Sequence, residues 1–154
     1  MSETVCLYKK ILFPTDFSEA SRYALFHAVN LARMCHAELY LVHVIYDIAA
    51  FQPHVAHPCL DQFIQEMIDA AKNEIDTAYI EELRGYDKLE KVVLRGSPSE
   101  VINDFARKNH IDIIVIGSVG RTGLEKIFFG NTADKVMRRA PCPVLVVRMP
   151  EHHK

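Results

Sequence analysis

A glycine-rich segment beyond a strongly apolar run holds the residues whose types and spacing best suit ligand chemistry. Gly117 follows the apolar run directly, and Gly120 lets the backbone turn with its amides pointing inward. Because glycine has no Cβ, phosphate oxygens can approach the main chain closely at such positions. Ser118 lies between these two glycines, and Arg121 adds a cation that suits outer phosphates. The segment therefore predicts a phosphate-binding loop.

The same segment ends at a predicted helix start. Gly130, Asn131 and Thr132 open that helix, whose free amides and positive dipole end favour an anion. The glycine spacing matches neither a Walker loop nor the GxGxxG pattern. The alternative is an ordinary strand-to-helix connection in which glycines make turns and Asn131 or Thr132 only caps the helix. We favour phosphate binding because a strand, a glycine loop and a helix start coincide here.

Asp16 is the candidate carboxylate, and it follows the first predicted strand. It could assist a metal or act in catalysis, but an Asx turn or a cap before Ser18 explains it equally well. Ser118 does not fit the Gly-x-Ser-x-Gly nucleophile elbow. No acid and base pair accompanies the glycine loop, so the sequence favours binding over catalytic turnover and predicts no catalytic residue.

A group of histidines has a loosely metal-like spacing. His54, His57 and Cys59 lie close together, and His43 is nearby in the sequence. A polar loop is the simpler interpretation, because such short motifs predict metal sites poorly. We therefore expect no metal centre.

The composition and the cysteines limit the classes of protein to which this chain can belong. The 154 residues predict a single domain, 1–154, with a formal net charge of -2. That balance argues against a general nucleic-acid or membrane-surface binder, and no stretch approaches the ~20 apolar residues that span a bilayer. The cysteines form no CxxC pair, so we expect reduced thiols in a soluble cytoplasmic protein. They are Cys6, Cys35, Cys59 and Cys142.

Strand and helix patterns alternate along the chain. The expected strands are 11–13, 39–45, 91–94, 113–116 and 143–147, and the expected helices are 18–35, 60–83, 98–109 and 132–139. Ser18 is a predicted N-cap, Ser97 to Glu100 reads as a capping box, and Gly85 fits a helix stop. This alternation predicts an α/β fold with a parallel sheet covered on both faces. The second helix is expected to bury Leu60, Phe63, Ile64, Met67, Ile68, Ala71, Ile75 and Ala78.

Ligands of such sheets bind beyond the carboxyl ends of the strands. Pro14, Thr15 and Asp16 follow the first predicted strand, Val44 lies near the end of the second, and Gly117 follows the fourth. These residues should therefore meet at one edge of the sheet.

Four segments resemble the universal stress protein family. Residues 10–18, KILFPTDFS, resemble the opening of these proteins, and residues 41–44, LVHV, resemble their second strand. Residues 116–130 are similar to the family's ATP signature, Gly-x2-Gly-x9-Gly-(Ser/Thr), and residues 140–147 to its C-terminal strand. The likeness covers essentially the whole chain, in order.

The resemblance implies a three-layer α/β/α, Rossmann-like fold of the adenine nucleotide alpha hydrolase type, with strand order 3-2-1-4-5. It also implies ATP as ligand, with Mg or Mn, while AMP or ADP would suit the same site. Asn131 departs from the signature's Ser or Thr, which bears on triphosphate affinity more than on adenosine recognition. In ATP-binding members, the positions that match Pro14, Thr15 and Asp16 hold the adenosine, and the position that matches Val44 contacts adenine through its backbone. The positions that match the following residues contact the phosphates: Gly117, Gly120, Gly130, Asn131 and Thr132.

The last predicted strand, 143–147, should lie at an edge of the sheet, where native proteins cover exposed apolar backbone. In the family this strand pairs with a second subunit, so we expect a homodimer; the alternative is an edge shielded by the C-terminal tail. The leading hypothesis is a regulatory stress-response module in which ATP orders residues 118–129 and changes the protein surface. The alternatives are a slow ATPase or phosphoryl-transfer enzyme, and a member that binds no nucleotide and acts through protein contacts.

Overall fold

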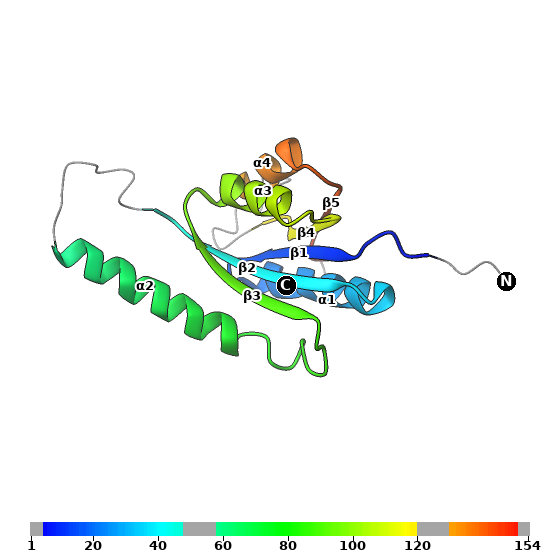
Figure 1. Cartoon of the computed structure of the whole chain (residues 1–154), viewed down its shortest axis with the longest axis horizontal. Helices are drawn as coiled ribbons and strands as arrows, with labels where there is room; N and C mark the ends of the chain where they lie inside the picture. Colours follow the sequence, from blue (N-terminus) through cyan, green and yellow to red (C-terminus); the bar gives the residue numbers. More distant parts are fainter. Residues whose placement is uncertain (1–4, 48–57, 120–129, 151–154) are drawn as a thin grey trace.

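The computed structural model describes residues 5–47, 58–119 and 130–150. Its five strands form one parallel sheet in the order β3-β2-β1-β4-β5, with helices between them (Figure 1). The predicted α/β fold and its strand order are therefore confirmed. The elements are β1 (Lys10–Thr15), α1 (Glu19–Cys35), β2 (Glu38–Ile45), α2 (Pro58–Thr77), β3 (Leu89–Arg95), α3 (Pro98–Lys108), β4 (Ile113–Gly117), α4 (Asn131–Arg139) and β5 (Val144–Val147).

Two hydrophobic cores lie on opposite faces of the sheet. Because side chains alternate along a strand, Ile11 and Phe13 belong to the core beneath α1, whereas Leu12 belongs to the core beneath α3 and α4. Figure 1 shows α1 and α2 on one side of the sheet and α3 and α4 on the other. The side chains of Ile11, Leu12 and Phe13 are all completely buried, which explains why this part of β1 is a continuous apolar run in the sequence.

Helix α1 follows the sequence prediction closely. The Ser18 side chain accepts a hydrogen bond from the backbone N–H of Ser21 and caps the helix start. His36 adopts a left-handed conformation, with φ of 52°, and ends the helix after Cys35. The helix runs back along β1, so its last residue lies beside the segment that precedes the strand.

Helix α2 differs from the prediction. It ends at Thr77 instead of residue 83, and turns follow up to Gly85, whose φ is 73°. Phe63 was expected in the core but is 50% exposed, because the first part of α2 extends past the edge of the sheet (Figure 1). Ile64, Ala71 and Ile75 are buried as expected.

The starts of α3 and α4 also correct the sequence analysis. Ser97 occupies the N-cap position of α3 and Pro98 follows it, but the Ser97 side chain makes no capping hydrogen bond. The helix start is therefore correct and the capping box is wrong. At α4 the N-cap is Gly130, so Asn131 is the first helical residue and neither Asn131 nor Thr132 caps the helix.

The expectation of four reduced thiols is wrong for one pair. Cys6 and Cys35 form a disulfide, with their Cα atoms 5.2 Å apart, while Cys59 and Cys142 are free. The pairing follows from the path of α1, which brings Cys35 back to the residues before β1. No helix among the described residues has the length and apolar character needed to cross a bilayer.

Candidate functional site

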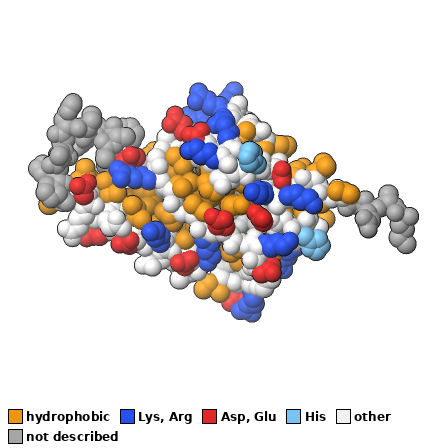
Figure 2. Space-filling view, viewed as in Figure 1, with side chains coloured by type: hydrophobic (Ala, Val, Ile, Leu, Met, Phe, Trp, Pro, Cys, Tyr) orange, Lys and Arg blue, Asp and Glu red, His pale blue; other side chains and the backbone are white. Residues whose placement is uncertain are grey.

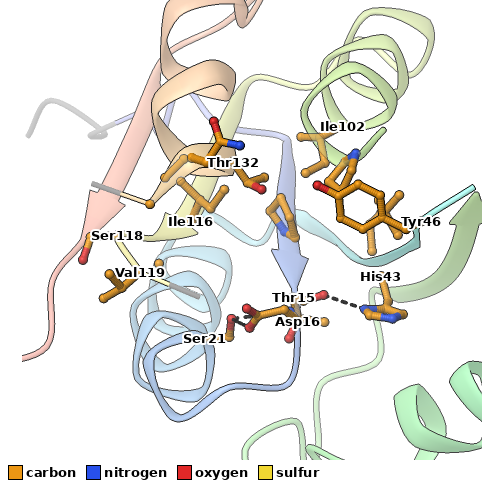
Figure 3. Close-up of a pocket in the computed structure, with 18 residues that line it drawn as sticks. Thr15, Asp16, Ser21, His43, Tyr46, Ile102, Ile116, Ser118, Val119 and Thr132 are labelled. Atoms are coloured by element: carbon orange, nitrogen blue, oxygen red, sulfur yellow. Dashed lines mark hydrogen bonds between the residues drawn. The ribbon is translucent and has the colours of Figure 1, made fainter. Parts of the chain in front are cut away.

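A cavity of about 450 Å³ lies where the carboxyl ends of β1, β2 and β4 meet the starts of α3 and α4 (Figure 3). This is the edge at which the sequence predicts a ligand. Its lining consists of Pro14, Thr15, Asp16, Ser21, Val42, His43, Val44, Tyr46, Pro98, Ile102, Ile116, Gly117, Ser118, Val119, Gly130, Asn131, Thr132 and Ala133.

Most of the predicted site residues meet in this cavity. The structure brings together Pro14, Thr15, Asp16, Val44, Gly117, Ser118, Gly130, Asn131 and Thr132, which come from four separate parts of the chain. Gly120 and Arg121 lie outside the described residues.

Asp16 is fixed at the start of α1. Its Oδ1 accepts hydrogen bonds from the backbone N–H of Ser18 at 3.0 Å and from Oγ of Ser21 at 2.6 Å. The first of these bonds forms the Asx turn that the sequence analysis kept as an alternative, and that interpretation is confirmed. The carboxylate is thereby held in one orientation at the wall of the cavity.

The turn from β1 to α1 is held by a residue far away in the sequence. Phe17 has φ of 61°, which costs a residue with a Cβ about 1–2 kcal/mol. Oγ1 of Thr15 compensates by accepting the Phe17 N–H at 3.0 Å, and it also lies 2.6 Å from the Tyr79 hydroxyl. Burial raises the pKa of Tyr79, so this hydroxyl keeps its proton at neutral pH.

His43 supports the same turn from β2. Its Nδ1 lies 2.8 Å from the carbonyl oxygen of Thr15, and a carbonyl only accepts, so Nδ1 carries the hydrogen. In neutral His43 the other ring nitrogen, Nε2, is then an acceptor. The Phe17 ring lies against the imidazole, with centroids 4.6 Å apart. Figure 3 shows His43 and Thr15 joined at the lower edge of the cavity.

The start of α4 supplies hydrogen-bond donors. In a helix the first N–H groups have no acceptor within the helix, and here the ladder begins with Asp134 N–H bonded to the Gly130 carbonyl at 3.0 Å. Asn131, Thr132 and Ala133, whose amides precede Asp134, all line the cavity. This end of the helix also carries the positive part of its dipole, so an anion in the cavity would be stabilised.

Backbone hydrogen bonds hold the two ends of the glycine-rich segment together. The Gly130 N–H donates to the Ser118 carbonyl, and the Ser118 N–H donates to the Val147 carbonyl at 2.9 Å. Ser118 is only 3% exposed. Ser118 and Gly130 therefore lie side by side at the start of α4.

Gly117 has a role that the sequence analysis did not anticipate. A Cβ at this position would lie 3.3 Å from the backbone oxygen of Ala20 and 3.6 Å from the backbone nitrogen of Ser21. The missing side chain thus lets β4 pack closely against the first turn of α1. Close approach of a phosphate is not needed to explain this glycine.

Apolar side chains form the remaining walls, and the sequence analysis did not single them out. Val42 and Ile116 belong to the core on the α3 and α4 side of the sheet, and Ile102 reaches the cavity from α3. The alternation of side chains along β2 and β4 could have indicated them, because it places the residues near the ends of both strands on the same face of the sheet. Ser21 could also have been found from the sequence, because it lies three residues after Ser18, in the first turn of the helix that Ser18 caps.

The histidine group lies only in part among the described residues. Within residues 5–47, 58–119 and 130–150, no cluster of three or more His, Cys, Asp or Glu side chains could hold a metal ion. His54 and His57 lie outside these residues, and Cys59 is exposed near the start of α2.

Comparison with known proteins identifies the family that combines this sheet order with a strand-end cavity. A sequence model of the universal stress protein family matches residues 7–148, and the chain belongs to that family. Universal stress protein MJ0531 of Methanocaldococcus jannaschii is 37% identical over 150 residues, which cover 94% of this chain and 85% of the relative. The structure of universal stress protein UspA from Lactobacillus plantarum is 31% identical with a TM-score of 0.78, covering 93% of this chain and 99% of that one.

Two more distant structures of the family are nucleotide complexes. One is a universal stress protein from Archaeoglobus fulgidus in complex with dAMP, at 24% identity and a TM-score of 0.63, covering 92% of this chain and 98% of that one. The other is a universal stress protein in complex with cAMP, at 23% identity and a TM-score of 0.59, covering 91% and 96%. At these identities they show a shared fold.

Proposed function

We propose that this chain is a cytoplasmic, homodimeric regulatory protein of the stress response that binds ATP in the cavity between β1, β2, β4 and α4. The proposal rests on one observation: a single cavity combines apolar walls with the N-terminal end of helix α4. Adenine is flat and apolar on its faces, whereas the phosphates are anionic, so one nucleotide would use both parts. The family structures that contain dAMP and cAMP support an adenine nucleotide.

The apolar part of the cavity suits a purine base. Val42, Val44, Ile102 and Ile116 line it, together with Pro14. The backbone of β2 at Val44 offers hydrogen-bonding groups to the edge of the base, as the family resemblance implies. Burial of the base against these side chains supplies the hydrophobic part of the binding free energy.

Asp16 suits the ribose. A carboxylate held in place by Ser18 and Ser21 presents acceptor oxygens to sugar hydroxyls without further ordering cost. The phosphates would then extend towards Asn131, Thr132 and Ala133 at the start of α4, and the amides there would donate to phosphate oxygens. Asn131, which replaces the family's Ser or Thr, contributes its backbone N–H whatever its side chain.

The dimer is proposed from the edge of the sheet. β5 is the last strand in the order, and its Leu145 is 41% exposed. An apolar edge strand invites pairing with another chain, and a second copy of β5 would cover it.

Isothermal titration with ATP and magnesium tests nucleotide binding. The Asp16→Asn variant keeps an oxygen for the Ser18 N–H but loses the charge, and we expect about tenfold weaker binding or more, since hydrogen bonds to charged groups contribute about 1.5–3 kcal/mol. Asp104→Asn, the same carboxylate-to-amide change at an exposed position of α3, is the matched control and should bind like the parent. Absence of heat with ATP, ADP and AMP alike would reject the proposal, and steady ADP release would instead favour an ATPase.

A further inference from the structure

A second cavity, of about 820 Å³, opens at the other end of the sheet. Lys9, Glu38 and Lys88, which line it, lie at the beginnings of β1, β2 and β3, whereas the nucleotide pocket lies where strands end. The last residues of α1 complete it. The described residues that line it are Val5, Cys6, Lys9, Met34, Cys35, His36, Glu38 and Lys88.

The disulfide forms part of the wall of this cavity. Cys6 is partly exposed, whereas Cys35 is only 7% exposed and packs in the core beneath α1. Of the two cysteines that line the cavity, Cys6 is therefore the more exposed residue, and we take it as the side from which a nucleophile approaches. Disulfide exchange requires such access, and exposed disulfides are the labile ones.

Among the described residues that line this cavity, the charged side chains are two lysines and one glutamate. Lys9, His36 and Lys88 line the cavity, and the Lys88 ammonium donates to the His36 carbonyl at 3.0 Å, which keeps it at the rim. Glu38, the acidic residue of the described lining, accepts a hydrogen bond from the Tyr40 hydroxyl at 2.8 Å. In Figure 2, basic side chains and histidine lie together with acidic ones at the right of the view, the side on which β1 begins in Figure 1. The excess of positive charge favours an anionic thiol over a neutral one.

We propose that Cys6–Cys35 is a reversible thiol–disulfide exchange site for a small anionic thiol of the glutathione type. The thiolate attacks Sγ of Cys6, the bond between the two protein sulfurs breaks, and Cys35 leaves as a thiolate that takes a proton from water. The thiolate of a second external thiol then attacks the external sulfur of the mixed disulfide, and Cys6 leaves as a thiolate that takes a proton from water. The products are two protein thiols and the oxidised external disulfide, so the two electrons gained by the protein come from two external thiols.

Reduction changes the surface at this end of the protein. Once the covalent link to α1 is broken, the backbone N–H groups of Lys9 and Lys10, which bond to Oδ2 of Asp112 at 2.7 and 2.8 Å, still hold the start of β1. Residues 5–8 lose their covalent tether to α1, so that only apolar contacts keep Cys6 and Tyr8 against the core.

The test compares two thiols on the full chain. The oxidised protein is incubated with reduced glutathione or with neutral 2-mercaptoethanol at low ionic strength, quenched with acid, and analysed by intact and peptide mass spectrometry. We expect a transient glutathione adduct on Cys6. The double variant Lys9→Gln/Lys88→Gln should react with glutathione about fivefold to tenfold more slowly, from the loss of two nearby charges, and with 2-mercaptoethanol at the parental rate.

The double variant Lys72→Gln/Lys135→Gln removes the same charge from exposed lysines outside the cavity and should behave like the parent with both thiols. An adduct on Cys35, an equal slowing with both thiols, or a disulfide that resists excess glutathione would each overturn the proposal. Because the readout is covalent chemistry at Cys6, it does not depend on nucleotide binding.

Discussion

The hydroxyl of Tyr79 lies 2.6 Å from Oγ1 of Thr15, although 64 residues separate them in the sequence. Thr15 lines the cavity that we propose to bind a nucleotide, and Tyr79 lies behind it, 1% exposed, in the turn region after α2. This bond fixes the Thr15 side chain that accepts the Phe17 N–H and so stabilises the left-handed turn. The position of Asp16 in the pocket therefore depends on a residue that does not line it.

Replacing Tyr79 with Phe removes only the hydroxyl group. We expect unfolding free energy to fall by about 1 kcal/mol and ATP affinity to fall about fivefold, because Thr15 and the turn are held less firmly. Urea denaturation and calorimetric titration measure the two effects. Tyr86→Phe is the control, since its hydroxyl donates to Ala37 at the opposite end of the sheet; it should lower stability but leave affinity unchanged. Equal losses of affinity in both variants would show that Tyr79 acts only through stability.

The disulfide should contribute measurably to stability. Cys6 and Cys35 are 29 residues apart, and closing a loop of that size stabilises a fold by about 3–4 kcal/mol in the chain-entropy description. We expect the Cys6→Ser variant to unfold at a clearly lower urea concentration than the parent under oxidising conditions. Cys59→Ser, at a free cysteine, should not change the midpoint. If reductant leaves the parental midpoint unchanged, the disulfide does not form in solution.

Leu145 tests the role of the sheet edge. Its side chain is 41% exposed on β5, so Leu145→Asp should leave the fold intact while placing a charge where a second copy would pair. Light scattering after size exclusion should give the mass of a dimer for the parent and of a monomer for the variant. A parent that is monomeric at micromolar concentration would contradict the proposed assembly.

The raised pKa of Tyr40 predicts how the stability of the fold falls at alkaline pH. Burial, a hydrogen bond to Glu38 and the charges of Glu38 and Glu90 raise the pKa of Tyr40 to about 12. The unfolded value is about 10, so the stability that depends on the protonated hydroxyl is complete below about pH 10 and is lost as the pH rises towards about 12. Tyr40→Phe should therefore show a shallower loss of stability above about pH 10 in urea denaturation. Parallel curves for parent and variant would contradict this.

The sequence predicts the elements whose signals are local. The apolar run Ile11 to Phe13 and the Ser18 cap each depend on neighbouring residues, and the structure agrees with both. The edge position of β5 depends on the strand order that the family resemblance implies, and it is also confirmed. The meeting of Asp16 with the start of α4 follows from the rule that parallel strands end at one edge.

Contacts between distant segments were not predictable in the same way. The Tyr79 to Thr15 bond depends on how the turns after α2 cross the sheet, and the Cys6–Cys35 disulfide depends on where α1 ends relative to β1. Gly117 looked like a phosphate-binding glycine because the sequence does not reveal that Ala20 occupies the space beside it. Phe63 fits a buried stripe, yet α2 extends past the sheet that would cover it.

Titration of isotope-labelled protein with ATP and magnesium, followed by amide NMR, examines the central claim most directly. We predict the largest shifts at the amides of Asn131, Thr132 and Ala133, with further shifts at Asp16 and Val44. Amides around Cys35 and Lys88, at the other end of the sheet, should stay in place. The claim that a nucleotide binds between the ends of β1, β2 and β4 and the start of α4 would be contradicted by either of two results. The amides at the start of α4 would not shift, or the largest shifts would occur around Cys35 and Lys88.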